Sequence, residues 1–109
     1  MMNEIKITGT EKQVAWATDI RAAYIAGGIK GATEGVSAFR LYASGQMKAA
    51  GITPADLMPR RAELLALIPV AYDRICATPA AAWWIDNRGN LDAVLATEWV
   101  AMVRAALGK

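Results

Sequence analysis

The sequence predicts an all-α protein, a compact bundle of four to five helices with a short extended segment at its N-terminus. Apolar residues recur at steps of three and four residues through most of the chain, which is the periodicity of amphipathic helices. Threonine, asparagine and proline stand before several of these runs, as they do at helix starts. With 109 residues, 55% of them hydrophobic and 20% charged, we expect a single helical domain over residues 1–109.

The N-terminal segment is the exception to the helical periodicity. Residues 2–8 alternate, with Ile5 and Ile7 on one side and Glu4 and Lys6 on the other, as in a short strand. No other segment has the alternation needed to pair with it. We therefore expect either an extended tail packed on helices or a strand that pairs only within an oligomer.

The first helix is predicted to begin at Glu11. The Thr10 hydroxyl can accept a hydrogen bond from the amide of Gln13, whose side chain can reach back to the Thr10 amide, which makes a capping box. The glycine-rich residues 27–31 are expected to end the helix, since glycine readily adopts the left-handed conformation of a helix terminus. On a helical wheel the face expected to be buried holds Trp16, Ala17, Ile20, Ala23, Tyr24 and Gly27.

The middle of the chain is predicted to hold two further helices, divided by glycine and proline. Residues 33–50 repeat apolar residues at helical steps, and Gly51 is the natural end of that helix. Thr53 then caps a new helix with Pro54 at its first position. Pro59 interrupts this helix soon after it begins, so one turn is expected to lead into a longer helix.

A second break is expected within that longer helix, near Ile68. Pro69 lies inside an apolar stripe, lacks the amide that would bond to Leu65, and presses on the turn before it.

The last third of the chain is predicted to contain a short and a long helix. Thr78 and Pro79 repeat the cap-plus-proline signal and are expected to open the short one, which Arg88 and Gly89 close. Asn90 then caps the last helix, residues 91–107, with Gly108 just beyond its end. This helix is apolar on most of its circumference, so it should be central in the fold or lie at a subunit contact.

The composition argues against an enzyme with conventional side-chain chemistry. The chain has no histidine, which removes the commonest general base and the commonest metal ligand. The lone Cys76 lies at the edge of an apolar stripe and is interpreted as a buried, inert thiol. The carboxylates occur singly, without the paired motifs that bind metals. We therefore expect no enzymatic activity, no cofactor and no metal site.

The same features predict a cytoplasmic protein with no membrane association. The residues contain no apolar run of spanning length, no signal peptide and no cysteine pair for a disulfide. The net charge is only +2, from twelve basic and ten acidic residues scattered along the whole length, so no basic arm is present.

Two groups of residues are candidate partner contacts. Adjacent helical residues point about 100° apart, so Trp83 and Trp84 cannot both face one narrow core. Trp84 and the nearby Arg88 are of the residue types typical of interface anchors, with core packing as the alternative interpretation. Arg60 and Arg61, with Lys48 nearby, could form a patch for an anionic partner, or simply a solvated face on which the Arg61 stem packs.

Residues 7–21, ITGTEKQVAWATDIR, resemble a segment that recurs in small proteins of phages, prophages and other mobile elements. A later Trp-Trp-Ile-Asp string, residues 83–86, is similar to an aromatic string in the same proteins. The resemblance implies a genomic setting rather than an activity, and no functional residue is carried over from it. The capping box explains part of the first segment, but it leaves Lys12, one turn before Trp16, and Arg21, flanked by Val14 and Ile25, as a potential second contact face.

These observations favour a non-enzymatic phage or mobile-element protein that acts by binding a macromolecular partner. The most concrete version is a counter-defence inhibitor of the anti-CRISPR type, whose partner is a host or defence-system protein or a nucleoprotein complex. One alternative is a nucleic-acid-binding accessory protein that places Lys12, Arg21, Lys48, Arg60 and Arg61 on phosphates. Another is a structural module that self-assembles through the last helix. The predicted partner-binding residues are Lys12, Arg21, Arg60, Arg61, Trp84 and Arg88.

Overall fold

The structure, a computed structural model, describes residues 6–33 and 37–109, and it confirms the all-α prediction. Within the described residues the only β pairing is a single parallel bridge, between Thr8 and Ala80. The molecule is elongated, with principal dimensions of 48 × 26 × 26 Å. The elements in chain order are α1 (Glu11–Thr33), α2 (Ser37–Ala49), α3 (Pro54–Leu57), the 3₁₀ turn η1 (Met58–Arg60), α4 (Arg61–Leu65), α5 (Leu67–Cys76), α6 (Ala81–Asn87) and α7 (Leu91–Leu107).

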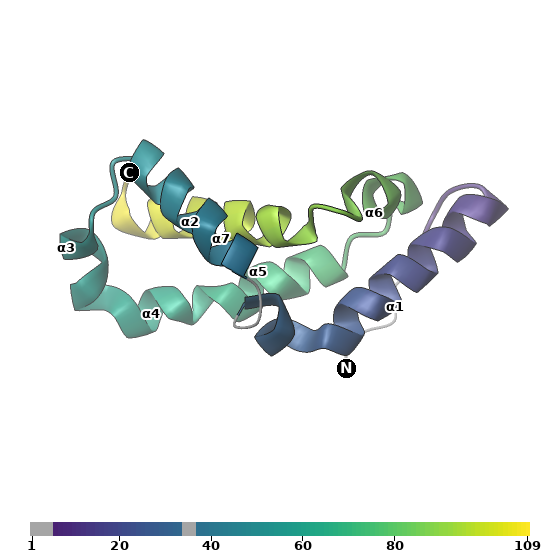
Figure 1. Ribbon diagram of the computed structural model, residues 1–109, viewed down its shortest axis with the longest axis horizontal. Helices are drawn as coiled ribbons and strands as arrows, with labels where there is room; N and C mark the ends of the chain where they lie inside the picture. The colour runs from purple at the N-terminus through teal and green to yellow at the C-terminus, as the bar shows by residue number, and fades with distance from the viewer. Residues whose placement is uncertain (1–5, 34–36) are drawn as a thin grey trace.

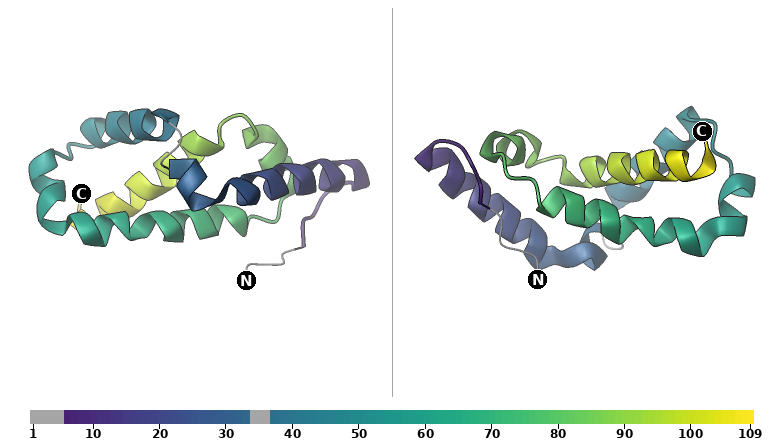
Figure 2. Two further views of the ribbon diagram at one scale, coloured as in Figure 1. Left: turned by 60° about the horizontal axis from the view of Figure 1, so that its bottom comes forward. Right: turned by 180° about the vertical axis from the view of Figure 1, so that it is seen from behind.

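The last helix is the centre of the arrangement. Helices α2 and α5 both pack on α7, while α1 packs mainly on α6 (Figure 1). In that view α6 and the first half of α1 lie at one end of the long axis and α3 lies at the other; the two further views show the same separation (Figure 2). Of the two alternatives predicted for the last helix, the structure shows the central position, and it places two separate surfaces at the two ends of the molecule.

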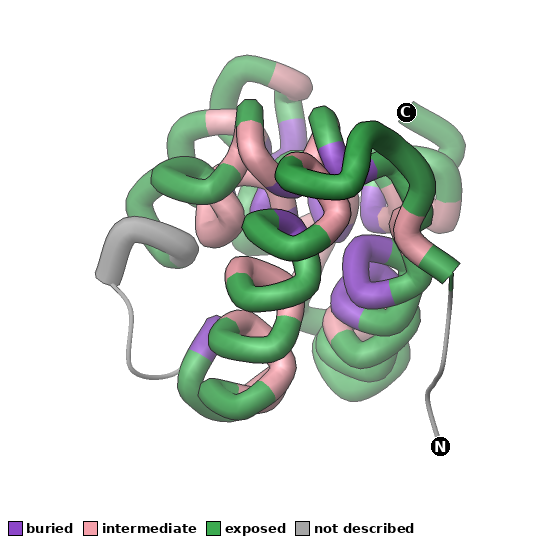
Figure 3. Tube along the Cα trace, turned by 90° about the vertical axis from the view of Figure 1, so that its right-hand side faces the viewer, coloured by how far each residue is buried: buried purple, intermediate pink, exposed green. Residues whose placement is uncertain are grey.

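The core is continuous from α1 to α7. Buried residues lie on the sides of the helices that face one another, and the outer surface is exposed (Figure 3). The fully buried side chains are led by Trp84, Leu64, Leu95 and Val103.

The start of α1 agrees with the sequence prediction. The Thr10 amide donates to Oε1 of Gln13 over 3.1 Å, and the Gln13 amide donates to Oγ1 of Thr10 over 3.2 Å, so the capping box is formed. Within residues 2–8, the part before Lys6 lies outside the described residues. The rest is extended and pairs within its own chain, because the Thr8 amide donates to the Pro79 carbonyl and the Ala81 amide to the Thr8 carbonyl.

The glycine-rich stretch interrupts α1. Gly28 has φ 68° and ψ 174°, which are not helical values, so Glu11–Thr33 consists of two helical pieces that meet at a kink there. The expected end of the first helix within residues 27–31 is therefore confirmed, and a second helical piece continues beyond it to Thr33. Thr33 belongs to α1, and the described part of the next helix, α2, is Ser37–Ala49; residues 34–36, which that prediction included, lie outside the described residues.

The predicted end of the second helix at Gly51 is confirmed. Gly51 has φ 76°, a left-handed conformation that suits glycine. Its amide donates to the Lys48 carbonyl, and the Ile52 amide donates to the Met47 carbonyl, which together make a Schellman motif. Met47 and Ile52 are both buried, so the apolar contact that accompanies this motif is also part of the core.

Two prolines divide the next region more finely than predicted. Pro54 begins α3, as expected, and Pro59 lies in η1, which joins α3 to α4. The break ascribed to Pro69 falls at Ala66, between α4 and α5, two residues before the expected position. The bundle therefore contains more helical elements than the predicted four to five.

The short helix α6 is capped differently from the prediction. Its first residue is Ala81 and its N-cap is Ala80, whereas Thr78 lies two residues beyond the end of α5, and its hydroxyl donates to the Arg74 carbonyl of that helix. Pro79 and Ala80 are held in an extended conformation by their pairing with Thr8, which moves the helix start two residues onward. Asn90 stands at the N-cap position of α7 as predicted, although its side chain makes no cap hydrogen bond, and Gly108, with φ 72°, closes the helix as predicted.

Candidate partner-binding surface

The buried face of α1 is only in part the one predicted: Ala17, Ile20 and Tyr24 face inward as expected, but other members of that face do not. Trp16 was expected in the core, but 48% of it is exposed, and Ala23 is exposed as well. The observed inner face centres on the fully buried Ala17, with the half-buried residues Val14, Ile20, Arg21, Tyr24 and Ile25 around it. The helical wheel ranked the faces of the helix by hydrophobicity alone, so it assigned Arg21 to the solvent-exposed side. In the structure this side chain is half-buried on the inner face.

The inward position of Arg21 has a specific cause. Its Nε donates to the carbonyl of Cys76, the last residue of α5, over 2.7 Å. The last carbonyls of a helix lack partners within the helix and carry a partial negative charge, so a guanidinium there is favourable. Arg21 therefore joins α1 to the end of α5, and its predicted role as a partner contact is corrected to a structural one.

Arg60 is used in the same way at the other end of the molecule. One guanidinium nitrogen donates to the carbonyl of Ala106, near the end of α7, over 2.7 Å. Its Nε donates to Oε1 of Glu63 over 2.9 Å, and the Arg60–Glu63 pair raises the pKa of the guanidinium and lowers that of the carboxyl. Because these contacts occupy the side chain, Arg60 is not available as the partner contact that was predicted.

Trp84 is the third predicted contact that belongs to the core. It is 0% exposed, and its indole N–H donates to the Thr78 carbonyl over 2.8 Å. Its ring packs edge-on against Trp83, with centroids 5.0 Å apart, and against Tyr24, at 6.1 Å. Of the tandem tryptophans, Trp83 is the more exposed one and only half-buried, so the choice of Trp84 as a contact was wrong.

Trp16 and Arg88 form an exposed pair. The Arg88 guanidinium carbon lies 4.8 Å from the centroid of the Trp16 ring, in a cation–π arrangement. Arg88 also donates to the Ile85 carbonyl in α6, which directs its side chain back along that helix. Arg88 is thus the one predicted arginine contact at this end of the molecule that remains on the surface.

Lys12 completes this surface. It lies four residues before Trp16 on α1, so the two side chains share one face of the helix. Lys12 is exposed, and no described residue forms an ion pair or hydrogen bond with its ammonium group. We call Lys12, Trp16 and Arg88 the Trp16 surface. The exposed Asp19, one turn beyond Trp16, adds a carboxylate at its edge.

Arg61 lies on a different part of the molecule. It is exposed on α4, beside an apolar groove near the α3 end. The predicted patch of Arg60, Arg61 and Lys48 does not form as such, because Arg60 turns to the end of α7.

The prediction of a buried Cys76 thiol is confirmed. Cys76 is 1% exposed, and burial raises its pKa above the ordinary value. Burial likewise raises the pKa of the neighbouring Tyr72 to about 12 and that of the Asp92 carboxyl above its ordinary value. Among residues 6–33 and 37–109 no three cysteine, aspartate or glutamate side chains gather to hold a metal ion.

No helix in the described part of the chain is both long and apolar enough to cross a membrane. No protein family model, curated protein or solved structure matches the chain.

Proposed function

We propose that this protein acts by binding a macromolecular partner, a host or defence-system protein, through the Trp16 surface. The observation that carries the proposal is the exposed Trp16 ring stacked with Arg88. Tryptophan and arginine are the residue types most enriched among side chains that dominate protein–protein affinity.

Trp16 has no structural role in the fold comparable to the roles of its neighbours on α1. The capping box explains Thr10 and Gln13, and core packing explains Ala17. Trp16 has 48% of its surface in solvent, although a smaller side chain would complete the same helix. A large aromatic ring held in place by a cation offers a partner a rigid apolar contact with little loss of conformational entropy.

The resemblance to phage and mobile-element proteins supports the setting of this proposal. Its first segment contains Lys12 and Trp16, and its second, residues 83–86, lies on α6, two residues before Arg88. The two segments are distant in sequence, yet α1 and α6 pack together. The most concrete version of the proposal is an anti-CRISPR-type inhibitor that occupies a surface of an effector protein or of its nucleoprotein complex.

The alternatives receive less support. The nucleic-acid hypothesis relied on five cations, of which Arg21 and Arg60 are engaged at helix ends. The remaining three, Lys12, Lys48 and Arg61, come from three different helices rather than from one strip. Assembly through α7 is less favoured because α2 and α5 already cover this helix.

Affinity capture tests the proposal. Tagged protein is expressed in a bacterial host that carries a CRISPR system, and co-purifying chains are quantified with and without nuclease treatment. We expect a stoichiometric protein partner that survives the nuclease, and at least tenfold less of it with Trp16→Ala. The matched control is Tyr42→Ala, which removes another helical aromatic ring of 47% exposure and should leave capture unchanged.

Two results would count against the proposal. The first is the absence of any stoichiometric protein partner. The second is equal loss of the partner with Trp16→Ala and Tyr42→Ala, once circular dichroism shows that both variants are folded. For the anti-CRISPR version, a plasmid-interference assay should show protection by the native chain and none by Trp16→Ala; a lack of protection by the native chain would remove that version alone.

A further inference from the structure

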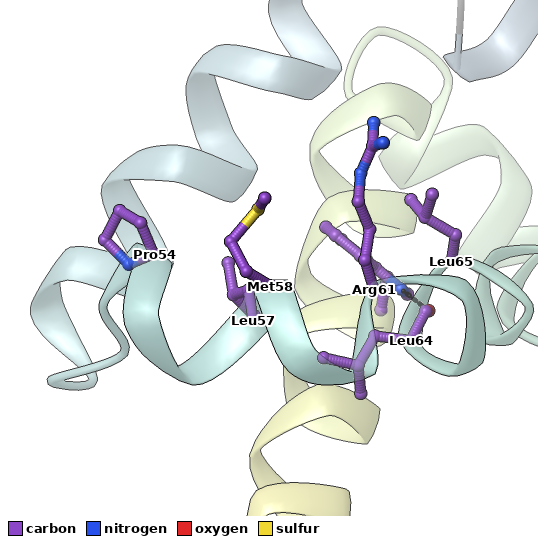
Figure 4. A pocket seen from close by; sticks show the side chains of 7 residues that line it. Pro54, Leu57, Met58, Arg61, Leu64 and Leu65 are labelled. Carbon is purple, nitrogen blue, oxygen red and sulfur yellow. Dashed lines mark hydrogen bonds between the residues drawn. The ribbon is translucent and has the colours of Figure 1, made fainter.

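An apolar groove of about 250 Å³ runs along α3, η1 and α4, near the end of the molecule opposite α6 (Figures 1 and 4). One wall is a row of residues from α3, η1 and α4. Successive residues of this row are four, three and four positions apart in the sequence, which places them on one side of the helical segment. The floor is formed by deeper residues of the same stretch and by one residue of α7. The wall holds Pro54, Met58, Arg61 and Leu65, and the floor holds Leu57, Leu64 and Trp99.

The floor of the groove is built and held rigidly. Trp99 and Leu64 are 9% and 2% exposed, and the indole N–H of Trp99 donates to the Leu64 carbonyl over 2.8 Å (Figure 4). The bond satisfies the indole N–H away from water, so the groove is lined by carbon without an unsatisfied donor at this point. A ligand would therefore meet a preformed apolar surface.

The wall is exposed to an unusual degree for its residue types. Met58 is 67% exposed and Leu65 is 42% exposed, and they lie two helical turns apart on the same side. Methionine is flexible and polarisable, which suits it to contact with varied partner side chains. Together they form an apolar edge about seven residues long, with Arg61 between them.

Arg61 is the only uncompensated charge that lines the groove in the described part of the chain. The charges nearby are already paired, Arg60 with Glu63, and Lys109 with Asp56 over 3.1 Å. No hydrogen bond or ion pair joins Arg61 to any described residue. Figure 4 shows its guanidinium extending away from the floor, between Met58 and Leu65. The groove thus combines an apolar channel with one positive charge at its rim.

We propose that this groove docks an amphipathic helix of a protein partner that carries a carboxylate beside its apolar stripe. Apolar side chains one and two turns apart on the incoming helix fill the channel between Met58 and Leu65, and an aspartate or glutamate on the same face pairs with Arg61. This is the helix-in-groove mode of recognition, with the charge setting the orientation. The site is separate from the Trp16 surface and does not rest on the proposed function.

Two synthetic helical peptides test the proposal. Both carry leucine at positions i, i+3, i+4 and i+7; one has glutamate at the flanking positions and the other has lysine. Binding of each labelled peptide to the full chain is measured by fluorescence anisotropy. We expect the glutamate peptide to bind and the lysine peptide to bind at least tenfold more weakly.

Charge reversal at Arg61 gives the sharper test. Arg61→Glu should weaken the glutamate peptide about fivefold or more, in keeping with the upper range of an exposed ion pair, and should strengthen the lysine peptide. Lys30→Glu makes the same change of charge at an exposed residue of α1 outside the groove and should alter neither. Met58→Ser, at a largely exposed position, should weaken both peptides without unfolding the chain.

The proposal is overturned if the glutamate peptide does not bind, if the two peptides bind native protein equally, or if Lys30→Glu acts like Arg61→Glu. None of these results would affect the capture experiment on Trp16, so the two proposals fail separately.

Discussion

Replacing Trp84 with phenylalanine should destabilise the protein far more than the same replacement at Trp16. Trp84 is fully buried, and its indole N–H donates to the Thr78 carbonyl. Phenylalanine keeps an apolar ring but loses this donor, and leaving the part-buried Thr78 acceptor without its partner costs about 1–2 kcal/mol, the lower part of the range for such groups. Trp16 makes a cation–π contact on the surface, and phenylalanine keeps most of it.

The volume change adds a second contribution at Trp84 only. The substitution removes roughly 40 Å³ from a closed site, and at about 24 cal/mol per Å³ of residual cavity this costs about 1 kcal/mol. We therefore expect Trp84→Phe to lower the free energy of unfolding by about 2–3 kcal/mol in total. A half-exposed position relaxes more easily, so Trp16→Phe should stay within about 0.5 kcal/mol of the native protein.

Urea unfolding followed by circular dichroism measures both variants. In thermal unfolding, Trp84→Phe should melt roughly 8–12 °C below the native protein, because 1 kcal/mol corresponds to about 4 °C for a domain of this size. Equal losses at the two positions, or a loss at Trp84 below about 0.5 kcal/mol, would refute the burial pattern on which the candidate surface depends.

Two further predictions concern pH and backbone conformation. Burial raises the pKa of Tyr72 from 10.0 to about 12; below pH 10 its contribution to stability is complete, and it is lost as pH rises from 10 to 12, because the unfolded chain ionises first. Between pH 10 and pH 12 the urea midpoint should therefore fall less for Tyr72→Phe than for the native protein. An equal fall in the two proteins would contradict the raised pKa of Tyr72. Gly51→Ala should lower the free energy of unfolding by about 1–2 kcal/mol because Gly51 has φ 76°. Gly45→Ala lies inside α2 with open space around the added carbon, so it should raise the free energy of unfolding by about 0.5–1 kcal/mol. Urea titration measures both variants, and a change of stability in the same direction would contradict this backbone argument.

Local signals along the chain were reliable guides to helix ends. The capping box at Thr10, the proline start at Pro54, the glycine end at Gly51 and the Asn90 start of α7 all agree with the structure. Each of these signals depends on residues within about five positions of one another, so no knowledge of the packing was needed.

Where a distant segment intervened, the same kind of signal failed. Thr78 and Pro79 look like the start of a helix, but pairing with Thr8 keeps Pro79 and Ala80 extended. That pairing joins segments some seventy residues apart, and Pro79 lies outside any alternating pattern that would reveal it.

The candidate site was accessible to sequence reasoning only in part. Lys12, Arg61 and Arg88 were correctly expected on the surface, and Trp16 was missed because a hydrophobic ring on an amphipathic helix was assigned to the core. One signal could have found it: Lys12, Trp16, Asp19 and Ala23 lie on one side of the wheel, and only Trp16 and Ala23 among them are apolar.

The sequence by itself determined that this chain is helical, where most helices begin and end, and that its last helix is apolar on most of its circumference, because these depend on local hydrogen bonding and on total hydrophobicity. The tertiary structure alone decided which side of α1 faces inward and which arginines remain on the surface. The ends of α5 and α7 needed donors for their last carbonyls, and Arg21 and Arg60 supplied them. With Arg21 turned inward, α1 presents Trp16 to solvent beside Arg88.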